Sequence, residues 1–268
     1  MEGRIAILGA GNLGIAIALG AIKDRLMKPE QITLTRRNLN KLDGLREKNF
    51  RIGSNNSEAV QQSEIIILCV QPKQVAGVVQ EIASSLVEGK HILVSTVTGI
   101  STDEIVHHLG DKNISVVRAM PNTAIAIGSS MTCICTHDAS QDQLNKVVRL
   151  FDRLGETLII EERLMKAATV LAASGIAFFM RYLRAATQGG IQLGFDAEDA
   201  QAIAAQTAKG AAMLLQKNES HPEMEIDKVT TPEGCTIAGL NEMEHQGLSS
   251  ALIKGILTSF EKINTIRK

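Results

Sequence analysis

Short apolar runs alternate with longer amphipathic segments over the first 160 or so residues. Consecutive Ile, Leu and Val residues in "RIAIL" (4–8), "QITLT" (31–35) and "SEIIILCV" (63–70) predict buried parallel strands. Further strands are expected within "HILVSTVTG" (91–99) and "ISVVRAMPN" (114–122), and "SSMTCICT" and "ETLIIE" are expected to extend the sheet. Helical segments separate these runs, so we predict an α/β fold with a Rossmann-like, doubly wound parallel sheet.

The pattern changes after about residue 161. Ala-rich segments with helical periodicity and no strand signal fill residues 162–195 and 196–218, and Asp196 is placed to cap the second of these helices. Several of the helices are apolar on more than one face, which is typical of buried helices. We therefore predict a dinucleotide-binding domain over residues 1–161 and an all-α domain over 162–268, whose surplus apolar surface is covered by another subunit.

The chain carries an unusual loop near its C-terminus, "TTPEGCT" (230–236). Pro222 and Pro232 enclose "EMEIDKVTT", which we interpret as a connection between helices, and the next helix is expected to begin near Cys235 or Thr236. Hydroxyl groups and free backbone amides at a helix N-terminus favour an anion site. A substrate carboxylate would suit it.

A complete G-x-G-x-x-G motif, "GAGNLG" (9–14), lies between the first predicted strand and the first predicted helix. In this position the motif predicts a dinucleotide site. Gly9 allows the tight turn, Gly11 lets the backbone approach a pyrophosphate, and Gly14 lets helix and strand pack closely. The helix N-terminus then faces the anion.

The residues after the second predicted strand favour NADPH over NADH. Arg36 and Arg37 stand where an NAD enzyme places an acid for the ribose hydroxyls, and guanidinium groups match a 2′-phosphate. Two solvated surface arginines are the alternative. The carboxyl ends of the other predicted strands, at residues 71–73, 95–99 and 118–122, are expected to line the same crevice.

Composition narrows the class of protein. With 28 basic and 29 acidic residues the net charge is −1, and aromatic residues are scarce, so binding to nucleic acid or to a membrane is not indicated. The longest apolar run in the second half has about a dozen residues, too few to span a bilayer. Four cysteines in a chain of this length do not form a disulfide framework, and no spacing of His, Cys or acidic residues indicates a metal. We expect a reduced, cytoplasmic protein.

Five motifs together resemble the pyrroline-5-carboxylate reductase family, over essentially the whole chain. They are "ILGAGNLG", "VRAMPNT", "AASGIAFF", "QTAKGAAML" and "HPEMEIDKVTTPEGCTIAGLNEME", the last being long and specific. The resemblance implies reduction of 1-pyrroline-5-carboxylate to L-proline by NADPH, with NADH as the alternative cofactor. It also implies a helical dimerisation domain and homodimers that assemble further into decamers.

The resemblance also assigns residues. It implies that Thr236 places a hydroxyl near the imine nitrogen and that the amides around Gly234 and Cys235 hold the substrate carboxylate. Thr231 occupies the family's serine position in the substrate loop, and Asn56 corresponds to an asparagine on the adenosine side of the cofactor. The full set of expected cofactor-binding residues is Gly9, Gly11, Asn12, Leu13, Gly14, Arg36, Arg37, Asn56, Val70, Pro72, Lys73, Met120, Pro121 and Asn122.

The sequence departs from the family pattern at several positions, namely Ala124, Ile176, Phe178, Arg184 and Glu233. These departures leave open a diverged imine reductase or a non-catalytic NADP-binding protein. A β-hydroxyacid-type dehydrogenase would need a lysine as acid, for which Lys166 and Lys209 are candidates by type only. Because no catalytic acid stands out, we expect catalysis by orientation, with Thr236 or water relaying a proton.

Overall fold

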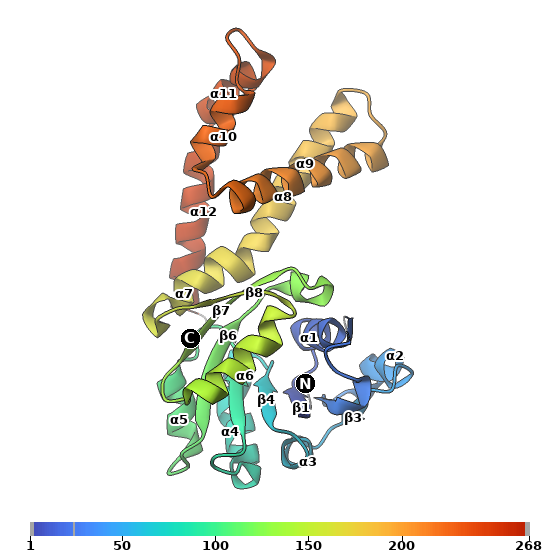
Figure 1. Cartoon of the computed structure of the whole chain (residues 1–268), viewed down its shortest axis with the longest axis vertical. Coiled ribbons are helices and arrows are strands. Elements are labelled where there is room, and N and C mark those ends of the chain that lie inside the picture. The colour runs from blue at the N-terminus through green and yellow to red at the C-terminus, as the bar shows by residue number, and fades with distance from the viewer. Residues whose placement is uncertain (1–2, 24, 266–268) are drawn as a thin grey trace. The chain divides into compact units, whose positions relative to one another are not determined.

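The computed structural model of the chain describes residues 3–23 and 25–265. Within them, eight strands form one sheet in the order β3-β2-β1-β4-β5-β6-β7-β8 (Figure 1), so the predicted fold class is confirmed. The strands are β1 (Ile5–Leu8), β2 (Ile32–Thr35), β3 (Arg51–Gly53), β4 (Ile65–Leu68), β5 (Ile92–Ser95), β6 (Ser115–Met120), β7 (Ser130–Thr136) and β8 (Gly155–Ile159).

The sheet is parallel from β3 to β6, and its last two strands run the other way. β7 pairs antiparallel with β6, and β8 is parallel to β7. The predicted extension of the sheet is therefore confirmed, with β7 antiparallel to its neighbour β6. Only residues 121–129 join β6 to β7, with a short 3-10 helix at Thr123–Ile127, and a parallel return requires a longer crossover. β3 was not predicted, because three half-buried residues, "RIG", carry no apolar run.

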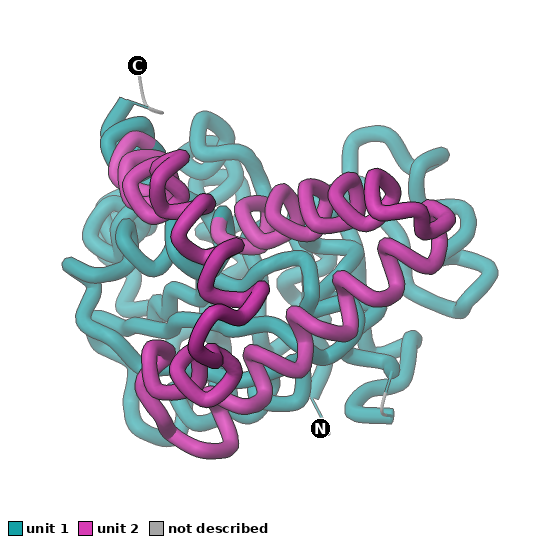
Figure 2. The backbone as a smooth tube through the Cα atoms, turned by 90° about the horizontal axis from the view of Figure 1, so that it is seen from above, with its two compact units in different colours: residues 1–174, 259–268 teal, residues 175–258 magenta. Residues whose placement is uncertain are grey.

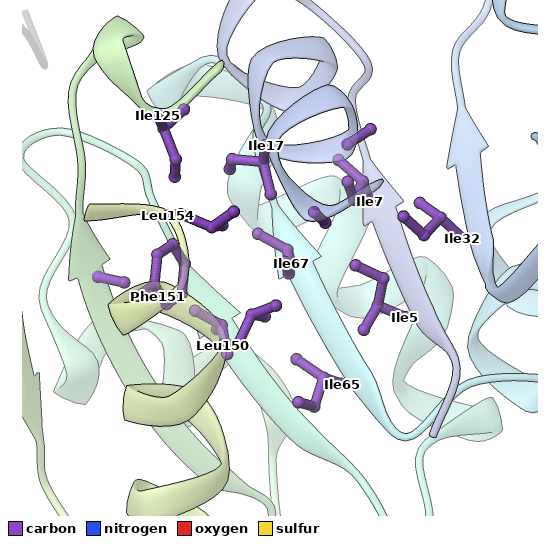
Figure 3. Packing of buried hydrophobic residues seen from close by; sticks show 14 of the residues in the cluster. Ile5, Ile7, Ile17, Ile32, Ile65, Ile67, Ile125, Leu150, Phe151 and Leu154 are labelled. Carbon is purple, nitrogen blue, oxygen red and sulfur yellow. The ribbon is translucent and has the colours of Figure 1, made fainter. Parts of the chain in front are cut away.

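Alternate residues of the central strands pack against two different layers of helices. Ile5 and Ile7 belong to one buried cluster, shown in Figure 3, and Ala6 and Leu8 belong to another on the opposite face. This period-two alternation, with both faces apolar, is what a doubly covered sheet requires. The helices that follow the strands of this unit are α1 (Asn12–Lys23), α2 (Asp43–Arg46), α3 (Asn56–Gln61), α4 (Val75–Ile82), α5 (Thr102–Leu109) and α6 (Gln141–Asp152).

The chain divides into two compact units, coloured separately in Figure 2. One contains residues 1–174 together with residues 259–268, and the other contains residues 175–258. The remaining helices are α7 (Met165–Ala168), α8 (Gly175–Gln192), α9 (Ala197–Asn218), α10 (Pro222–Val229), α11 (Cys235–His245) and α12 (Leu248–Ile263). A π-helical segment, Thr169–Ser174, joins α7 to α8.

The predicted connection after Pro222 is instead the helix α10, so that interpretation was wrong. Pro222 occupies the first turn of α10, where its missing N–H costs nothing, and the His221 side chain accepts a hydrogen bond from the amide of Glu223. The predicted start of the following helix is confirmed, because α11 begins at Cys235. Asp196 stands at the N-cap of α9, although its side chain makes no capping hydrogen bond.

The helical segment Glu162–Gln192 is longer and more apolar than the sequence pattern indicated. Its best 18-residue window has a mean hydropathy of 1.4 and is 22% buried, so by length and composition alone it could cross a membrane. The uninterrupted apolar run is short, but the helix continues through polar residues at both ends. Large apolar side chains stay exposed on the helices of residues 175–258, including Phe179, Met180, Ile203, Met213, Leu252 and Ile253.

Candidate functional site

The glycine-rich loop turns sharply between β1 and α1. The amides of Gly9 and Ala10 both donate to the Thr35 carbonyl, at 3.2 and 2.9 Å. Gly9 has φ +92°, and a Cβ added there would lie 2.6 Å from Val70 Cγ1. Only glycine fits this turn without strain.

The other two motif glycines lie in different surroundings. A Cβ on Gly14 would lie 3.0 Å from Ile7 Cγ2 and 3.1 Å from the Gly9 carbonyl oxygen, so helix and strand are in close contact there. A Cβ on Gly11 would meet only the Gly9 oxygen, at 4.0 Å. Gly11 thus leaves open space beside the loop, which is what the approach of a pyrophosphate requires.

The first turn of α1 presents backbone donors beside this loop. The first amide of the helix that donates to a carbonyl four residues earlier is that of Ile15, which donates to the Gly11 carbonyl at 2.9 Å. The preceding amides, of Asn12, Leu13 and Gly14, have no acceptor within the helix. Together with the helix dipole, they favour an anion such as a phosphate.

A cavity of about 360 Å³ lies at this end of the sheet. Its lining residues are Gly9, Ala10, Gly11, Thr35, Arg36, Arg37, Asn38, Ser54, Asn56, Cys69, Val70, Gln71, Gln74, Val78 and Glu81. It therefore gathers the carboxyl ends of β1, β2 and β4, together with one face of α4. The strand ends at 95–99 and 118–122, also expected in the crevice, do not line this cavity.

Six of the predicted cofactor-binding residues line the cavity and eight do not. Those lining it are Gly9, Gly11, Arg36, Arg37, Asn56 and Val70. Asn12, Leu13 and Gly14 form the first turn of α1, and Pro72 and Lys73 belong to the 3-10 turn before α4. Met120 is buried in a cluster with Cys133, Cys135 and Met165.

The two remaining residues of that set lie just after β6. Pro121 is buried, and Asn122 caps the short helix that follows. The Asn122 side chain accepts from the amide of Ala124 at 2.9 Å and donates to the Ala172 carbonyl at 3.3 Å. The Asn122 side chain thereby connects the end of β6 to the π-helical segment Thr169–Ser174.

The two arginines after β2 have different surroundings. Arg36 Nη1 donates to the Ala10 carbonyl at 2.8 Å, so this guanidinium holds the glycine-rich loop against the end of β2. No side-chain partner of Arg37 is recorded among the described residues, and Arg37 lines the cavity. Both groups bring positive charge to the cavity, and guanidinium groups match the geometry of a phosphate.

A chain of side-chain hydrogen bonds joins three other residues that line the cavity. The Thr35 hydroxyl donates to Asn56 Oδ1 at 2.6 Å, and Asn56 Nδ2 donates to Glu81 Oε2 at 3.0 Å. Sequence reasoning identified only Asn56 of these three. It also missed Ser54, Gln74 and Val78. Residues 74, 78 and 81 follow the i, i+4, i+7 spacing of one helix face, so their grouping could be recognised once that face was known to meet the cavity.

The loop before α11 is a tight turn. The Gly234 amide donates to the Thr231 carbonyl at 3.0 Å, and a Cβ on Gly234 would lie 2.5 Å from Thr231 Oγ1. Glu233 adopts a left-handed conformation, with φ +58°. Thr231, Glu233 and Cys235 are exposed, whereas Gly234 and Thr236 are half-buried. The loop and the first turn of α11 therefore present hydroxyls and backbone donors to an anion.

The buried thiols are poor nucleophiles. Burial raises the pKa of Cys69 to about 12, despite a hydrogen bond from the Thr96 hydroxyl to Sγ at 3.3 Å. Burial, with the charge of Glu162, raises the pKa of Cys135 to about 11, and burial also raises the pKa of Cys133. All four cysteines are free. Among the described residues, no group of three or more His, Cys, Asp or Glu could hold a metal ion.

An ion pair between a buried arginine and a half-buried glutamate lies near the end of β6. Arg118, whose side chain is 4% exposed, donates from Nη1 to Glu162 Oε1 at 2.9 Å. The same carboxylate accepts hydrogen bonds from the amide and the hydroxyl of Thr102, at the first residue of α5. Burial alone would raise the pKa of Glu162, but these bonds from Thr102 and Arg118 outweigh it and hold the pKa below its usual range. Arg118 is thus occupied in a structural contact.

Two family descriptions match separate parts of the chain. Residues 4–99 match "NADP oxidoreductase coenzyme F420-dependent", and residues 162–266 match "Pyrroline-5-carboxylate reductase dimerisation". The first match covers the glycine-rich loop and every residue that lines the cavity. The second match covers the loop before α11 and the exposed apolar helices.

Individual relatives span nearly the whole chain. Pyrroline-5-carboxylate reductase 2 of Dictyostelium discoideum is 49% identical over 274 residues, covering 97% of this chain and 91% of the relative. Pyrroline-5-carboxylate reductase 1 of the same organism is 48% identical over 97% of this chain, which spans only 49% of that longer protein. The solved structure of Plasmodium falciparum pyrroline carboxylate reductase with NADP bound has the same fold, with a TM-score of 0.90 and 21% identity over 100% of this chain and 99% of that one. The chain belongs to the pyrroline-5-carboxylate reductase family.

Proposed function

We propose that the protein reduces 1-pyrroline-5-carboxylate to L-proline, the last step of proline biosynthesis, with NADPH as the reductant. Family membership along the whole chain carries this proposal. The cavity supports it independently, because its glycine-rich turn, open backbone at Gly11 and adjacent arginines fit a phosphorylated dinucleotide. The departures at Ile176 and Glu233 bear on the identity of the substrate more than on the class of reaction.

The residues of the cavity would bind and orient the cofactor, whose nicotinamide supplies a hydride when it is bound. The loop at Gly9 and Gly11 and the first amides of α1, at Asn12, Leu13 and Gly14, would hold the pyrophosphate. Arg37 is the cation that we assign to the 2′-phosphate, because Arg36 already donates to the Ala10 carbonyl. Asn56 and Val70 would line the adenosine half.

We also propose a role for the predicted cofactor-binding residues that follow β4 and end β6. Pro72 and Lys73 follow β4 directly, at the carboxyl edge of the sheet, and Met120, Pro121 and Asn122 stand at the carboxyl end of β6. We propose that the cofactor runs past the backbone of these residues towards its nicotinamide end. NADH remains the weaker alternative. An NAD enzyme has a carboxylate after β2 that binds the free 2′-hydroxyl, and this chain has arginine there.

The loop before α11 would bind the substrate. The amides of Gly234, Cys235 and Thr236, with the Thr231 hydroxyl, would hold the carboxylate, and the Thr236 hydroxyl would orient the imine nitrogen. A protonated cyclic imine is already an electrophile, so orientation and proximity provide most of the catalysis. Thr236 or a water molecule would relay the proton.

The helical domain, which we place at residues 162–268, would form a homodimer, and dimers would assemble further into a decamer. The exposed side chains of Phe179, Met180 and Ile203 are apolar surface of the kind that a subunit interface covers. Burial in this subunit interface, rather than in a membrane, would account for the apolar surface of the segment Glu162–Gln192. We propose a cytoplasmic enzyme whose partner is a small cyclic imino acid and which binds neither nucleic acid nor membrane.

The test is oxidation of NADPH, followed by absorbance, with 1-pyrroline-5-carboxylate as substrate and NADH in a parallel assay. Rapid turnover with a preference for NADPH is the expected result. Thr236→Ala should lower kcat, and Gly234→Ala should prevent substrate binding because its Cβ would meet Thr231. NADPH binding without turnover on this or any related cyclic imine would overturn the proposal in favour of a binding protein. Turnover of a β-hydroxyacid would indicate the dehydrogenase alternative.

A further inference from the structure

Glu81 is a carboxylate in the wall of the cofactor cavity that no motif of the sequence indicates. It lies near the end of α4, on the same helix face as Gln74 and Val78, and all three line the cavity. Its oxygen Oε2 accepts from Asn56 Nδ2 at 3.0 Å. For the other oxygen, Oε1, no partner is recorded within residues 3–23 and 25–265.

The contacts of Asn56 fix the orientation of its amide. A carboxylate can only accept hydrogen bonds, so the amide nitrogen of Asn56 must face Glu81. The amide oxygen then faces Thr35, whose hydroxyl donates to it at 2.6 Å. Each group in the chain from Thr35 through Asn56 to Glu81 is therefore oriented by its neighbour, and the chain ends in an acceptor.

The structure assigns to Glu81 the recognition of a hydrogen-bond donor on the adenosine half of the cofactor. This inference rests on the proposed binding of NADPH in the cavity. The apolar side chains of Val70 and Val78 line the same cavity and suit a planar base, and Arg36 and Arg37 also line it and suit a phosphate. Two groups of adenosine can supply the donor: the amino group of the base and a ribose hydroxyl. A specificity-determining carboxylate thus completes the site from α4.

The variant Glu81→Gln tests this assignment without a change of size. The amide introduced by this substitution would accept from Asn56 with its oxygen and would place its NH₂ group where Oε1 stands in the wild type. A hydrogen-bond donor of the cofactor would then face another donor, the introduced NH₂ group, and the hydrogen bond would be lost. We expect NADP⁺ to bind roughly five- to tenfold more weakly, with the dissociation constant measured by calorimetric titration of the substrate-free protein.

A second ligand separates the two possible donors. Nicotinamide hypoxanthine dinucleotide phosphate carries a carbonyl oxygen in place of the amino group of the base and keeps the ribose. If the donor is the amino group, Glu81→Gln weakens NADP⁺ binding but strengthens binding of the hypoxanthine analogue, because the glutamine NH₂ can donate to that carbonyl. If it is a ribose hydroxyl, the variant weakens both ligands equally. Either result supports the assignment.

The control is Glu58→Gln, an exposed carboxylate on α3 that does not line the cavity, which should leave both dissociation constants unchanged. Unchanged binding of both ligands by Glu81→Gln, at wild-type thermal stability, would overturn the role of Glu81. Failure of the wild type to bind NADP⁺ at all would instead overturn the proposed function, so the two failures are distinguishable.

Discussion

The glycines of the nucleotide loop offer a matched pair of substitutions. In Gly9→Ala the new Cβ would lie 2.6 Å from Val70 Cγ1 and 2.9 Å from the Cys69 backbone, at a φ of +92°. We expect this variant to lose roughly 2–4 kcal/mol of unfolding free energy, as overpacked and strained sites do. Urea denaturation followed by circular dichroism measures it.

Gly11→Ala should behave differently, because its Cβ would have open space around it. We expect its unfolding free energy to stay within about 0.5 kcal/mol of the wild type. Its affinity for NADP⁺ should nevertheless fall at least about tenfold, because the methyl group would occupy the approach of the pyrophosphate. Wild-type affinity in Gly11→Ala would contradict the assignment of this loop to phosphate binding.

Glu233 is a non-glycine residue in the left-handed region, within the proposed substrate loop. Replacing it with glycine removes a steric cost of about 1 kcal/mol, partly offset by the greater freedom of glycine in the unfolded chain. It also removes a negative charge beside a proposed carboxylate site. We expect Glu233→Gly to lower KM for the imine with little change in kcat, as steady-state kinetics will measure.

Glu219→Gly is the control for this substitution, since Glu219 has a similar left-handed conformation, with φ +49°, outside the loop. It should share any gain in stability and leave KM unchanged. An equal change of KM in both variants would mean that the charge of Glu233 does not face the substrate.

His91 introduces a pH dependence into folding. Its side chain is buried, with 1% exposure, and Nδ1 accepts from the Val87 amide at 2.8 Å. Burial, aided by the charges of Lys90 and Lys112, lowers its pKa below the ordinary 6.5. The unfolded chain therefore binds a proton that the folded chain excludes, so stability is full above about pH 6.5 and declines as the pH falls through the interval below it.

Unfolding free energies measured from pH 7 down to pH 5 check this sign. His91→Asn keeps an acceptor for the Val87 amide but cannot be protonated. The decline between pH 6.5 and 5 should therefore be shallower in the variant than in the wild type. Parallel curves would show that other groups cause the decline.

At the scale of elements, the carboxylate of Glu162 connects three segments: α5 through Thr102, β6 through Arg118, and the helical turn that begins α7. Glu162→Gln would leave the buried Arg118 guanidinium without its counter-charge. We expect a loss of roughly 2–4 kcal/mol in unfolding free energy. Glu161→Gln, which removes an exposed ion pair with Arg163, should cost less than about 1 kcal/mol.

The lowered pKa of Glu162 predicts how the contribution of this carboxylate to the unfolding free energy changes with pH. The carboxylate is stabilised in its charged form, so its contribution is present above the unfolded value, near pH 4.3, and disappears as the pH falls through the lower folded value. The difference in unfolding free energy between wild type and Glu162→Gln should therefore narrow in acid. A constant difference down to pH 3 would argue against the ion pair.

Elements that are defined by local pattern were predictable, whereas those defined by contacts were not. The Ile-rich strands and the motif before α1 are visible in the sequence, because a buried strand and a phosphate loop each require a local pattern. The reversed direction of β7 and the short strand β3 were not predicted. The segment that forms the helix α10 was wrongly predicted to be a connection. In α10 two prolines suggested a break, whereas Pro222 begins the helix.

The same distinction applies to the site. Gly9, Gly11 and the two arginines follow from a local motif, and they line the cavity. Glu81 enters the cavity only because α4 packs beside α3, which brings it to Asn56 across 25 residues of sequence. No spacing in the chain predicts that pairing. Met120, although adjacent to a recognisable motif, has its side chain in a buried cluster with Cys133, Cys135 and Met165 rather than in the cavity.

At the scale of the whole molecule, the exposed apolar helices bear on assembly. Phe179 is 71% exposed on α8, although it is among the most apolar residues of the chain. In Phe179→Glu, we expect the proposed dimer to dissociate, because a charge would be buried without a partner at its interface. Sedimentation velocity would show a shift to the mass of one chain. Val87→Glu, at a similarly exposed site in the other unit, is the control and should leave the mass unchanged.

The unit built on the sheet includes the chain from residue 259 onward, after an excursion of 84 residues through the helical unit. Ile263, at the end of α12, is buried, and its Cγ2 is 3.9 Å from the position of a Cβ on Gly99. During synthesis on a ribosome, the first unit emerges early but lacks this last piece until the helical unit has also left the exit tunnel. Domains normally fold in the order in which they are made. Here the first unit to be translated is the last to be completed.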